Sequence, residues 1–357
     1  MRDELVRRRS WLTDGEFLDL LGASNLIPGP TSTELALHLG HRRAGAAGFL
    51  VAGLAFIGPA VAIVAAFAWA YVEFGAQPAA LALLAGVGPA VVAIVAHAAF
   101  GLARSAVRDP LAGAVAVGAV VAVVAGVAEI VVLLGAGVVA LAVRRARHLV
   151  GGAAGCAVAG QAIGGATASA GAASAVAGVV VAATPLALFA VLAKIGAILF
   201  GSGYLLVALL RSELVEGLGW ITERQLLDAV AVGQLTPGPV TTAATFVGWL
   251  VGGPVGAAAA TLGIFLPAFV AVALSIPILP RLRRSPAARA FLDGVNAAAV
   301  ALIGLVALQL GRAAIVDLPT AAIALGALAV LATGRVGSGW IVLGGGALGV
   351  AVALLRG

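Results

Sequence analysis

Long apolar runs, separated by short polar or charged stretches, dominate the pattern of the chain. A transmembrane helix needs about 20 predominantly apolar residues to cross the hydrocarbon core of a bilayer. The runs that fit one span each are residues 44–71, 79–103, 185–210, 254–279 and 291–310.

Two further apolar runs, residues 111–143 and 321–355, are too long for one span. Glu129 interrupts the first of them, so each run predicts a pair of short, closely packed helices. Taken together, the runs predict an all-α polytopic membrane protein of roughly ten spans.

The composition supports this class. Hydrophobic residues make up 62% of the 357 residues and charged residues only 10%, with a mean hydropathy of +1.15. A soluble globular chain carries about 25% charged residues. No water-soluble fold could cover so much apolar surface, so we expect lipids to surround the helices.

The net charge of +6 does not indicate a nucleic-acid-binding protein, because the arginines occur in short clusters between apolar runs. Their placement is typical of topology signals instead. Cys156 is the only cysteine, which excludes a disulfide framework and a cysteine-based metal site. We expect no metal and no cofactor.

An internal repeat divides the chain. The segment Asn25-Leu-Ile-Pro-Gly-Pro30 recurs as Gln234-Leu-Thr-Pro-Gly-Pro239, 209 positions later because 239 minus 30 is 209. Further along the chain, Phe56-Ile-Gly-Pro-Ala60 corresponds to Phe265-Leu-Pro-Ala268, which is one residue shorter. The sequence therefore predicts a duplication with a single-residue gap in this later segment.

The arginines give the orientation of the two copies, because positively charged loops stay in the cytoplasm. In the first half, Arg42 and Arg43 precede the long span; in the second half, a cluster between Arg281 and Arg289 follows it. The positive charges thus lie at the N-terminal end of the long span in the first half and at its C-terminal end in the second. We therefore predict two inverted-topology repeats of roughly five spans each, an arrangement found in many secondary transporters.

The predicted organisation is an N-terminal repeat over residues 1–148, a Gly/Ala-rich linker over 149–184 and a C-terminal inverted repeat over 185–357. The segment Arg2-Asp-Glu-Leu-Val6 recurs as Arg211-Ser-Glu-Leu-Val215. The second repeat has a span, residues 185–210, ahead of this segment, whereas the first repeat begins almost at it. Either the first half lacks this helix or the native start lies upstream of Met1.

The two Pro-Gly-Pro triplets must interrupt any helix that contains them. A broken helix is tolerated at membrane depth only where protein or a water-filled cavity satisfies the freed backbone groups. The segments 16–42 and 223–252 are too short for two spans but fit a re-entrant hairpin of two half-helices. The alternative is that the prolines only kink two spans.

Hydroxyl-bearing residues follow each triplet, where a new helix would start. Helix N-termini expose unpaired N–H groups and attract anions. The two half-helices predict a binding site for a tetrahedral dianion near the bilayer midplane. The candidate binding residues are Asn25, Pro28, Gly29, Pro30, Thr31, Ser32, Thr33, Lys194, Gly201, Ser202, Gly203, Gln234, Thr236, Pro237, Gly238, Pro239, Thr241 and Thr242.

Three charged or titratable positions have two interpretations each. Lys194, the only lysine, either attracts the anion or reaches the cytoplasmic interface. Glu34 either carries a coupled proton or serves a structural purpose, by pairing with Arg42 or Arg43 or by stabilising the helix N-terminus. His38 lacks ligand partners at metal-binding spacing, so an interfacial position is the expectation.

The chain resembles the chromate ion transporters, a family of two-domain membrane proteins. The resemblance rests on Pro28-Gly-Pro-Thr-Ser-Thr-Glu34 in the first half and on Phe200-Gly-Ser-Gly-Tyr204 and Gln234-Leu-Thr-Pro-Gly-Pro239 in the second. It implies a multi-pass protein of the bacterial inner membrane that exports chromate and confers chromate resistance. Sulfate, the isostere of chromate, is the expected competitor.

Other functions are weaker expectations. Uptake of sulfate or another oxyanion uses the same residue types, and a passive anion channel or an assembly partner such as a homodimer is a further alternative. An intramembrane enzyme is not expected, because the chain has no His-Glu-x-x-His pair, no Ser/His/Asp set and no cysteine cluster.

Overall fold

The computed structural model describes residues 29–150, 182–200, 203–278 and 285–356, and in the N-terminal segment residues 6, 8, 11–14, 16, 17, 20, 24 and 27. Most of the predicted linker and four of the candidate binding residues, Asn25, Pro28, Gly201 and Ser202, lie outside the described residues.

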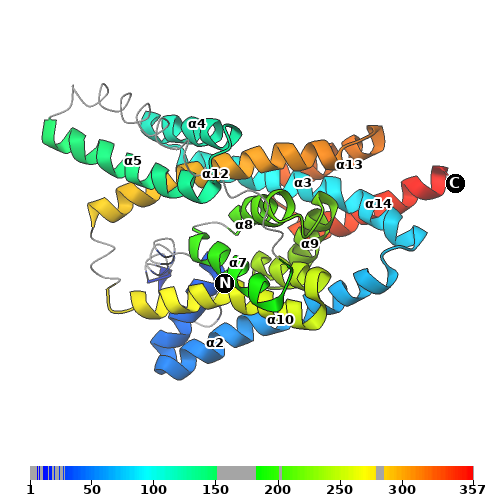
Figure 1. Cartoon of the computed structure of the whole chain (residues 1–357), viewed down its shortest axis with the longest axis horizontal. Coiled ribbons are helices and arrows are strands. Elements are labelled where there is room, and N and C mark those ends of the chain that lie inside the picture. Colours follow the sequence, from blue (N-terminus) through cyan, green and yellow to red (C-terminus); the bar gives the residue numbers. More distant parts are fainter. Residues whose placement is uncertain are drawn as a thin grey trace.

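The fold is helical, as predicted, and its long helices lie side by side along the longest axis (Figure 1). The first half contributes α2 (Thr31–Phe74), α3 (Pro78–Ala106), α4 (Pro110–Val124) and α5 (Glu129–Val150). The second contributes α7 (Pro185–Ile198), α8 (Leu205–Leu210), the π-helical segment η3 (Arg211–Gly217), α9 (Glu223–Leu235), the 3-10 turn η4 (Val240–Thr242), α10 (Ala243–Ser275), α12 (Pro286–Ala314), α13 (Leu318–Ala332) and α14 (Ser338–Arg356).

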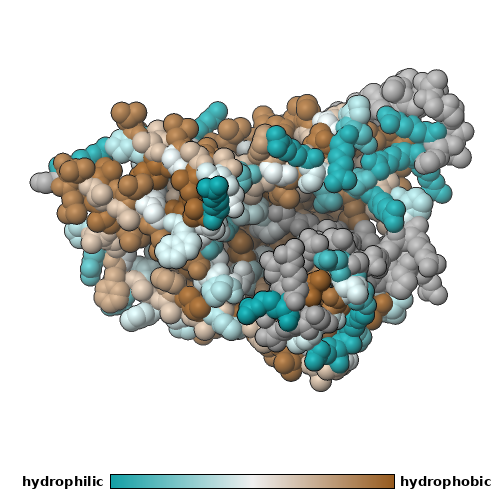
Figure 2. Space-filling view, turned by 180° about the vertical axis from the view of Figure 1, so that it is seen from behind, coloured by the Kyte–Doolittle hydropathy of each residue, from teal (hydrophilic) through white to brown (hydrophobic). Residues whose placement is uncertain are grey.

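Among the residues that the structure describes, five segments are long and apolar enough to cross a membrane: α2, α3, η4 with α10, α12 and α14. Large apolar side chains on their outer faces are exposed, among them Leu54 on α2 and Leu274 on α10, each 67% exposed. Apolar residues cover much of the face shown in Figure 2, and hydrophilic residues gather toward its right-hand end. These surfaces suit contact with lipid, and the protein is a multi-pass membrane protein.

Both α2 and α10 contain a sharp reversal of the chain. In α2 the break falls at Ala44 and Gly45, and the Gly45 backbone has φ 57° and ψ −142°. In α10 it falls at Gly252 and Gly253, and Gly253 has nearly the same angles, φ 60° and ψ −152°. Glycine tolerates this left-handed region because it lacks a Cβ atom. Each element is therefore two helices joined by a tight turn.

The two arms of each broken helix pack closely. A Cβ atom on Gly40 would lie 2.2 Å from the carbonyl oxygen of Gly48, and one on Gly248 would lie 2.5 Å from that of Gly256. Both pairs are eight residues apart, a separation of about 12 Å in a straight helix. The short arms, residues 31–43 and 240–251, thus run back along the first turns of the long arms.

The rest of each half repeats the same plan. The helices α3 and α12 both have 29 residues and start 208 positions apart, since 286 minus 78 is 208. The helices α4 and α13 both have 15 residues at the same offset, since 318 minus 110 is 208. The breaks at Ala44 and Gly252 also differ by 208. The one-residue gap therefore precedes these breaks, inside the shorter second arm, and not near Ala60 as the sequence alignment predicted.

The packing partners of the halves are exchanged. From the first half, α4 and α5 pack on α12; from the second, α13 and α14 pack on α3, while α3 and α12 contact each other. The closest approaches are equivalent: Gly86 on α3 meets the backbone of Gly345 and Gly349, and Gly294 on α12 meets the backbone of Ala136. Each half therefore completes the core of the other.

One predicted span is wrong. Residues 185–210 form α7 and the short α8, which a non-helical stretch around Leu199 and Phe200 separates. The paired short helices were correctly predicted, but Glu129 is the first residue of α5 and lies beyond the connection.

Candidate functional site

The triplets of the two halves occupy equivalent positions, each against the long helix of the other half. A Cβ atom on Gly29 would lie 2.9 Å from the Cβ atom of Ala268 on α10. A Cβ atom on Gly238 would lie 2.4 Å from that of Ala60 on α2. Because Ala60 and Ala268 are themselves repeat equivalents, the two contacts have the same relationship. Only residues without a side chain allow this approach.

The first triplet also contacts the stretch that separates α7 from α8. The backbone N–H of Gly29 donates a hydrogen bond of 2.5 Å to the carbonyl oxygen of Leu199. Gly203 and Tyr204 continue this stretch, and the Tyr204 side chain is hydrogen-bonded to Gln234 on α9. The broken segment therefore lies between the two triplet regions.

A helix starts after each triplet without a side-chain cap. Pro30 precedes α2 and Pro239 precedes η4, and neither residue can cap a helix with a side-chain oxygen. No capping side chain accepts from the first N–H groups of these helices. The N–H groups of Thr33 and Thr242 donate instead to the carbonyls of Pro30 and Pro239, at 2.8 Å and 3.0 Å.

Polar atoms without partners surround these helix starts. The hydroxyls of Thr33 and Thr241 are fully buried, and neither has a hydrogen-bond partner among the described residues. The side-chain nitrogen of Gln234 is also without one. Other hydroxyls are occupied locally, since Thr236 donates to the Gly233 carbonyl at 3.0 Å and Thr242 donates to the Pro239 carbonyl at 2.9 Å. Buried polar groups normally have partners, so these three groups are exceptions among the described residues.

Glu34 is fully buried, and both carboxyl oxygens are without a partner in the described part of the chain. The predicted pairing with Arg42 or Arg43 is wrong. Arg42 forms an ion pair with Glu16, and Arg43 stacks over the ring of Trp11 at 4.2 Å. A buried carboxyl group without a hydrogen-bond partner is unfavourable, so Glu34 is an unsatisfied polar group in the described structure.

His38 lies one turn beyond Glu34 on the same arm of α2 and is only 5% exposed. The prediction of an interfacial position is therefore wrong for this residue. Its Nε2 atom has no partner among the described residues. His38 extends the row of buried polar groups that begins at Thr33.

Lys194 forms an ion pair with Glu213, with 2.6 Å between Nζ and Oε2. Its side chain is 46% exposed, so the pair is reachable from outside the protein. The remaining described candidates, Thr31, Ser32 and Pro237, are partly or fully exposed around the helix starts.

The family comparison adds independent information at this point. The family model described as chromate transporter matches residues 1–141 and 186–350. The chain belongs to the chromate transporter family. This is a family of transporters, and its two matched segments leave out the linker region.

Curated chromate transporter relatives are similar over most of their length. The chromate transport protein of Cupriavidus metallidurans is 33% identical over 93% of this chain and 81% of its own. A probable chromate transport protein of Synechococcus elongatus is 32% identical over 92% and 82%, and the chromate transport protein of Pseudomonas aeruginosa is 32% identical over 87% and 75%. No solved structure matches the chain.

Two features of this chromate transporter family member were not expected from its sequence. Asp228 on α9 is 1% exposed and accepts a 2.9 Å hydrogen bond from the Tyr71 hydroxyl on α2. Arg211 bridges Glu216 and Glu223 at 2.6 Å each. Arg211 and Asp228 lie 209 positions after Arg2 and Asp19, so the repeat was the available signal. Their partners Tyr71 on α2 and Glu223 on α9 could not be read from sequence spacing.

Proposed function

We propose that the protein exports chromate, a divalent tetrahedral oxyanion, across the bacterial inner membrane as a secondary transporter and so confers chromate resistance. The observation that carries the proposal is the set of buried, partnerless donors beside two uncapped helix starts. Family membership and the names of the relatives support chromate as the anion.

We infer that the halves form an inverted repeat, with organisation 1–148, linker 149–184 and 185–357. The common offset of 208, the matching breaks and the exchanged packing support this inference. The arginine clusters lie at opposite ends of the equivalent long spans, which supports opposite orientations. In transporters with such repeats, anionic substrates bind near the midplane at half-helix N-termini.

The two short arms are the proposed re-entrant half-helices. Residues 31–43 and 240–251 are too short to cross a bilayer, and each turns back at its glycine. The binding site comprises the residues that follow the triplets together with Gln234, Lys194 and the segment 201–203. Asn25 and Pro28, as repeat equivalents of Gln234 and Pro237, complete the first half of the site.

Energetics favour export driven by the membrane potential. Moving one charge across 100 mV is worth about 2.3 kcal/mol, so a dianion leaving a negative interior gains about 4.6 kcal/mol per 100 mV. The Glu34 carboxyl lies beside Gly29, and its negative charge would repel a dianion there if it lost its proton. The anion therefore binds only while Glu34 keeps its proton, and Glu34 is the proposed coupling residue.

Radiolabelled chromate uptake into everted membrane vesicles tests the proposal, with a potential that is positive inside the vesicle. The expected result is saturable accumulation that stops when valinomycin and balanced K⁺ remove the potential. Excess sulfate should inhibit by competition. A chromate flux that is independent of the membrane potential and increases linearly with chromate concentration would contradict an exporter and favour a channel. Accumulation of sulfate in right-side-out vesicles instead would favour an uptake transporter.

The homodimer remains a prediction that cross-linking in the membrane can check.

A further inference from the structure

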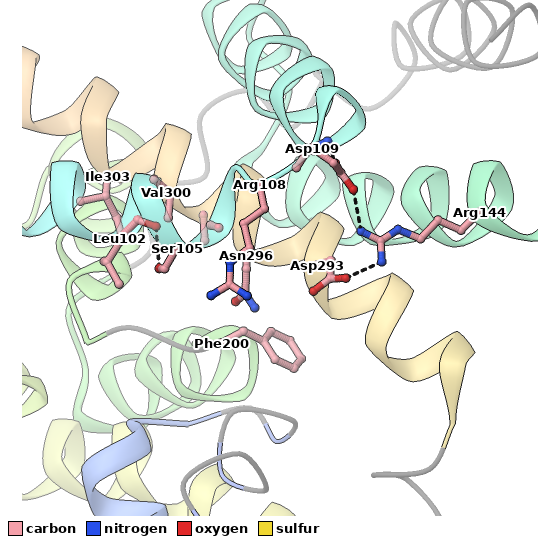
Figure 3. A pocket seen from close by; sticks show the side chains of 13 residues that line it. Leu102, Ser105, Arg108, Asp109, Arg144, Phe200, Asp293, Asn296, Val300 and Ile303 are labelled. Carbon is pink, nitrogen blue, oxygen red and sulfur yellow. Dashed lines mark hydrogen bonds and ion pairs between the residues drawn. The ribbon is translucent and has the colours of Figure 1, made fainter. Parts of the chain in front are cut away.

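A charged pocket of about 430 Å³ lies where the end of α3, the start of α4, the end of α5 and the start of α12 meet (Figure 3). These ends carry arginines of the first half, among them Arg104 and Arg144, so they lie on the cytoplasmic side of the proposed topology. Its polar lining consists of Ser105, Arg108, Asp109, Arg144, Asp293 and Asn296.

Most charges in the pocket are already paired. Arg144 bonds Asp109 at 3.1 Å and Asp293 at 2.6 Å, so it ties the two hairpin helices α4 and α5 to α12. Ser105 donates its hydroxyl to the Leu102 carbonyl at 2.8 Å. The two ion pairs of Arg144 join these helices at the pocket, and the Ser105 hydroxyl is occupied within α3.

Arg108 and Asn296 are different. Neither side chain has a hydrogen bond or an ion pair within the part of the chain that the structure describes. In Figure 3 the Arg108 guanidinium reaches into the pocket beside Asn296, with the Phe200 ring facing it. Arg108 is exposed, and it is the one arginine of the pocket that no carboxylate neutralises.

The repeat supplies an internal comparison. At the offset of 208, Arg108 corresponds to Val316, Asn296 to Gly88 and Asp293 to Ala85. The helix-capping residue Asp109 is retained as Asp317, which caps α13 in the same way. The other half therefore keeps the structural cap but has no guanidinium or amide at the equivalent positions. The free donors of this pocket belong to one side of the membrane only.

The pocket adjoins the triplet region through the broken segment. Phe200 lines it, and the neighbouring Leu199 carbonyl accepts the hydrogen bond from Gly29. We propose that Arg108 and Asn296 form a capture site for the divalent oxyanion on the cytoplasmic side, ahead of the Pro-Gly-Pro site. The proposal rests on the oxyanion transport proposed above.

Guanidinium and amide groups suit this ligand. Arginine binds tetrahedral oxyanions through two parallel N–H groups, and its charge does not depend on pH in the working range. The amide of Asn296 adds neutral N–H donors without a compensating acid. Arg144 is bonded to both Asp109 and Asp293, so the four charged groups of the pocket sum to zero. The attraction for an anion therefore comes from direct contact with the unpaired guanidinium of Arg108.

The test is the KM and maximal rate of chromate uptake in everted vesicles, where this face is exposed to the medium. We expect Arg108→Gln to raise KM roughly tenfold, the loss of one charge-assisted contact, with a much smaller change in maximal rate. Arg108→Lys should recover part of the loss, and Asn296→Leu should raise KM less than Arg108→Gln. The control is Arg312→Gln, which removes an exposed arginine at the opposite end of α12 and should leave KM unchanged.

The outcomes are distinguishable. Wild-type KM in both Arg108→Gln and Asn296→Leu would overturn the capture site while the transporter proposal stands. No energised uptake by the wild type would instead overturn the transporter proposal. If Arg108 binds a lipid phosphate rather than the free anion, the effect of Arg108→Gln would vanish in liposomes of phosphatidylcholine alone and require phosphatidylglycerol. A KM effect in both lipid compositions supports capture of the free anion.

Discussion

Gly238 lies directly against Ala60, and a Cβ atom added to the glycine would be 2.4 Å from the Cβ atom of the alanine. The contact joins the second Pro-Gly-Pro triplet to the long arm of α2, across the two halves. Its counterpart, Gly29 against Ala268, joins the first triplet to α10. The two halves are therefore tied together at the triplets themselves.

Gly238→Ala should separate the second triplet from α2. Neither the rigid triplet nor the Ala60 backbone can yield easily, and overpacking of this kind costs about 1–3 kcal/mol. We expect chromate transport to be lost or strongly reduced and the melting temperature of the purified protein to fall. Gly58→Ala is the control, because its added Cβ atom would have open space around it. Equal transport by both variants would contradict the importance of this contact.

Thr241→Val should separate ligand binding from stability. The buried Thr241 hydroxyl has no partner in the described structure, so its removal should change the free energy of unfolding by less than about 1 kcal/mol. Chromate uptake should nevertheless fall sharply, because the hydroxyl is a proposed donor to the oxyanion. Both quantities are measured on the same purified and reconstituted samples.

The matched control is Thr245→Val on the same arm. Thr245 is bonded to Thr261 across the hairpin at 2.8 Å, so its replacement should lower stability by about 1 kcal/mol. Its hydroxyl already has a partner, so KM should stay near that of the wild type. The prediction fails if Thr241→Val behaves like Thr245→Val, with reduced stability and normal KM.

A charge exchange at Lys194 and Glu213 can separate structural pairing from anion attraction. The Lys194 side chain is 46% exposed and that of Glu213 23%, so breaking this solvent-accessible pair should alter stability by less than about 1 kcal/mol. We expect Lys194→Ala to weaken chromate uptake, and the double variant Lys194→Glu with Glu213→Lys to remain weak because the positive charge has moved. Full recovery in the double variant would show that only the ion pair matters.

Asp317 gives an acid-dependent contribution to stability. The hydrogen bond from the Thr320 backbone, together with the Thr320 hydroxyl and Arg356, lowers the pKa of Asp317 from 3.8 to about 2. A lowered folded-state pKa stabilises the protein above the unfolded value, and this stabilisation is lost as the pH falls from about 4 through 2. Thermal melting of the purified protein between pH 6 and pH 2 should therefore depend less on pH in Asp317→Asn. A Glu73→Gln variant should keep the wild-type dependence.

The repeat and the spans could be predicted from the sequence because apolar length and identical triplets are local signals. The positions of α3, α12, α4 and α13 follow from the pattern within a few residues. The break at Leu199 was not predicted, because apolar residues continue on both sides of Gly201-Ser202-Gly203 and the run was interpreted as one span. The hydrogen bond from Gly29 to the Leu199 carbonyl shows a contact that holds the chain at this break. Tertiary contact overrides local propensity at this point.

Side-chain partners were the least predictable part of the site. Pairing of Glu34 with Arg42 was one interpretation, because the two residues share a helix. In the structure Arg42 forms an ion pair with Glu16, and the buried carboxyl of Glu34 has no partner among the described residues. Sequence spacing shows which residues share a helix face, but an acid before the helix can compete for the same cation. The pocket around Arg108 likewise depends on four helix ends that meet only in the folded protein.

Glu34→Gln tests whether the buried proton takes part in transport. The amide keeps the shape and neutrality of the protonated acid, so the variant should still bind and move chromate. In the wild type, loss of the proton at alkaline pH would place a negative charge beside Gly29 and repel the dianion, so uptake should fall as the pH rises. The variant cannot lose this proton, and its uptake should stay constant over the same range.

Vesicle uptake is measured from pH 6 to pH 9 at a fixed potential set by valinomycin and a K⁺ gradient, with His41→Gln as the control for a more exposed group on the same arm. If the wild type and Glu34→Gln show the same decline with pH, another group carries the proton. If Glu34→Gln is silent at every pH although it is inserted normally, the carboxyl itself, and not its neutrality, is required.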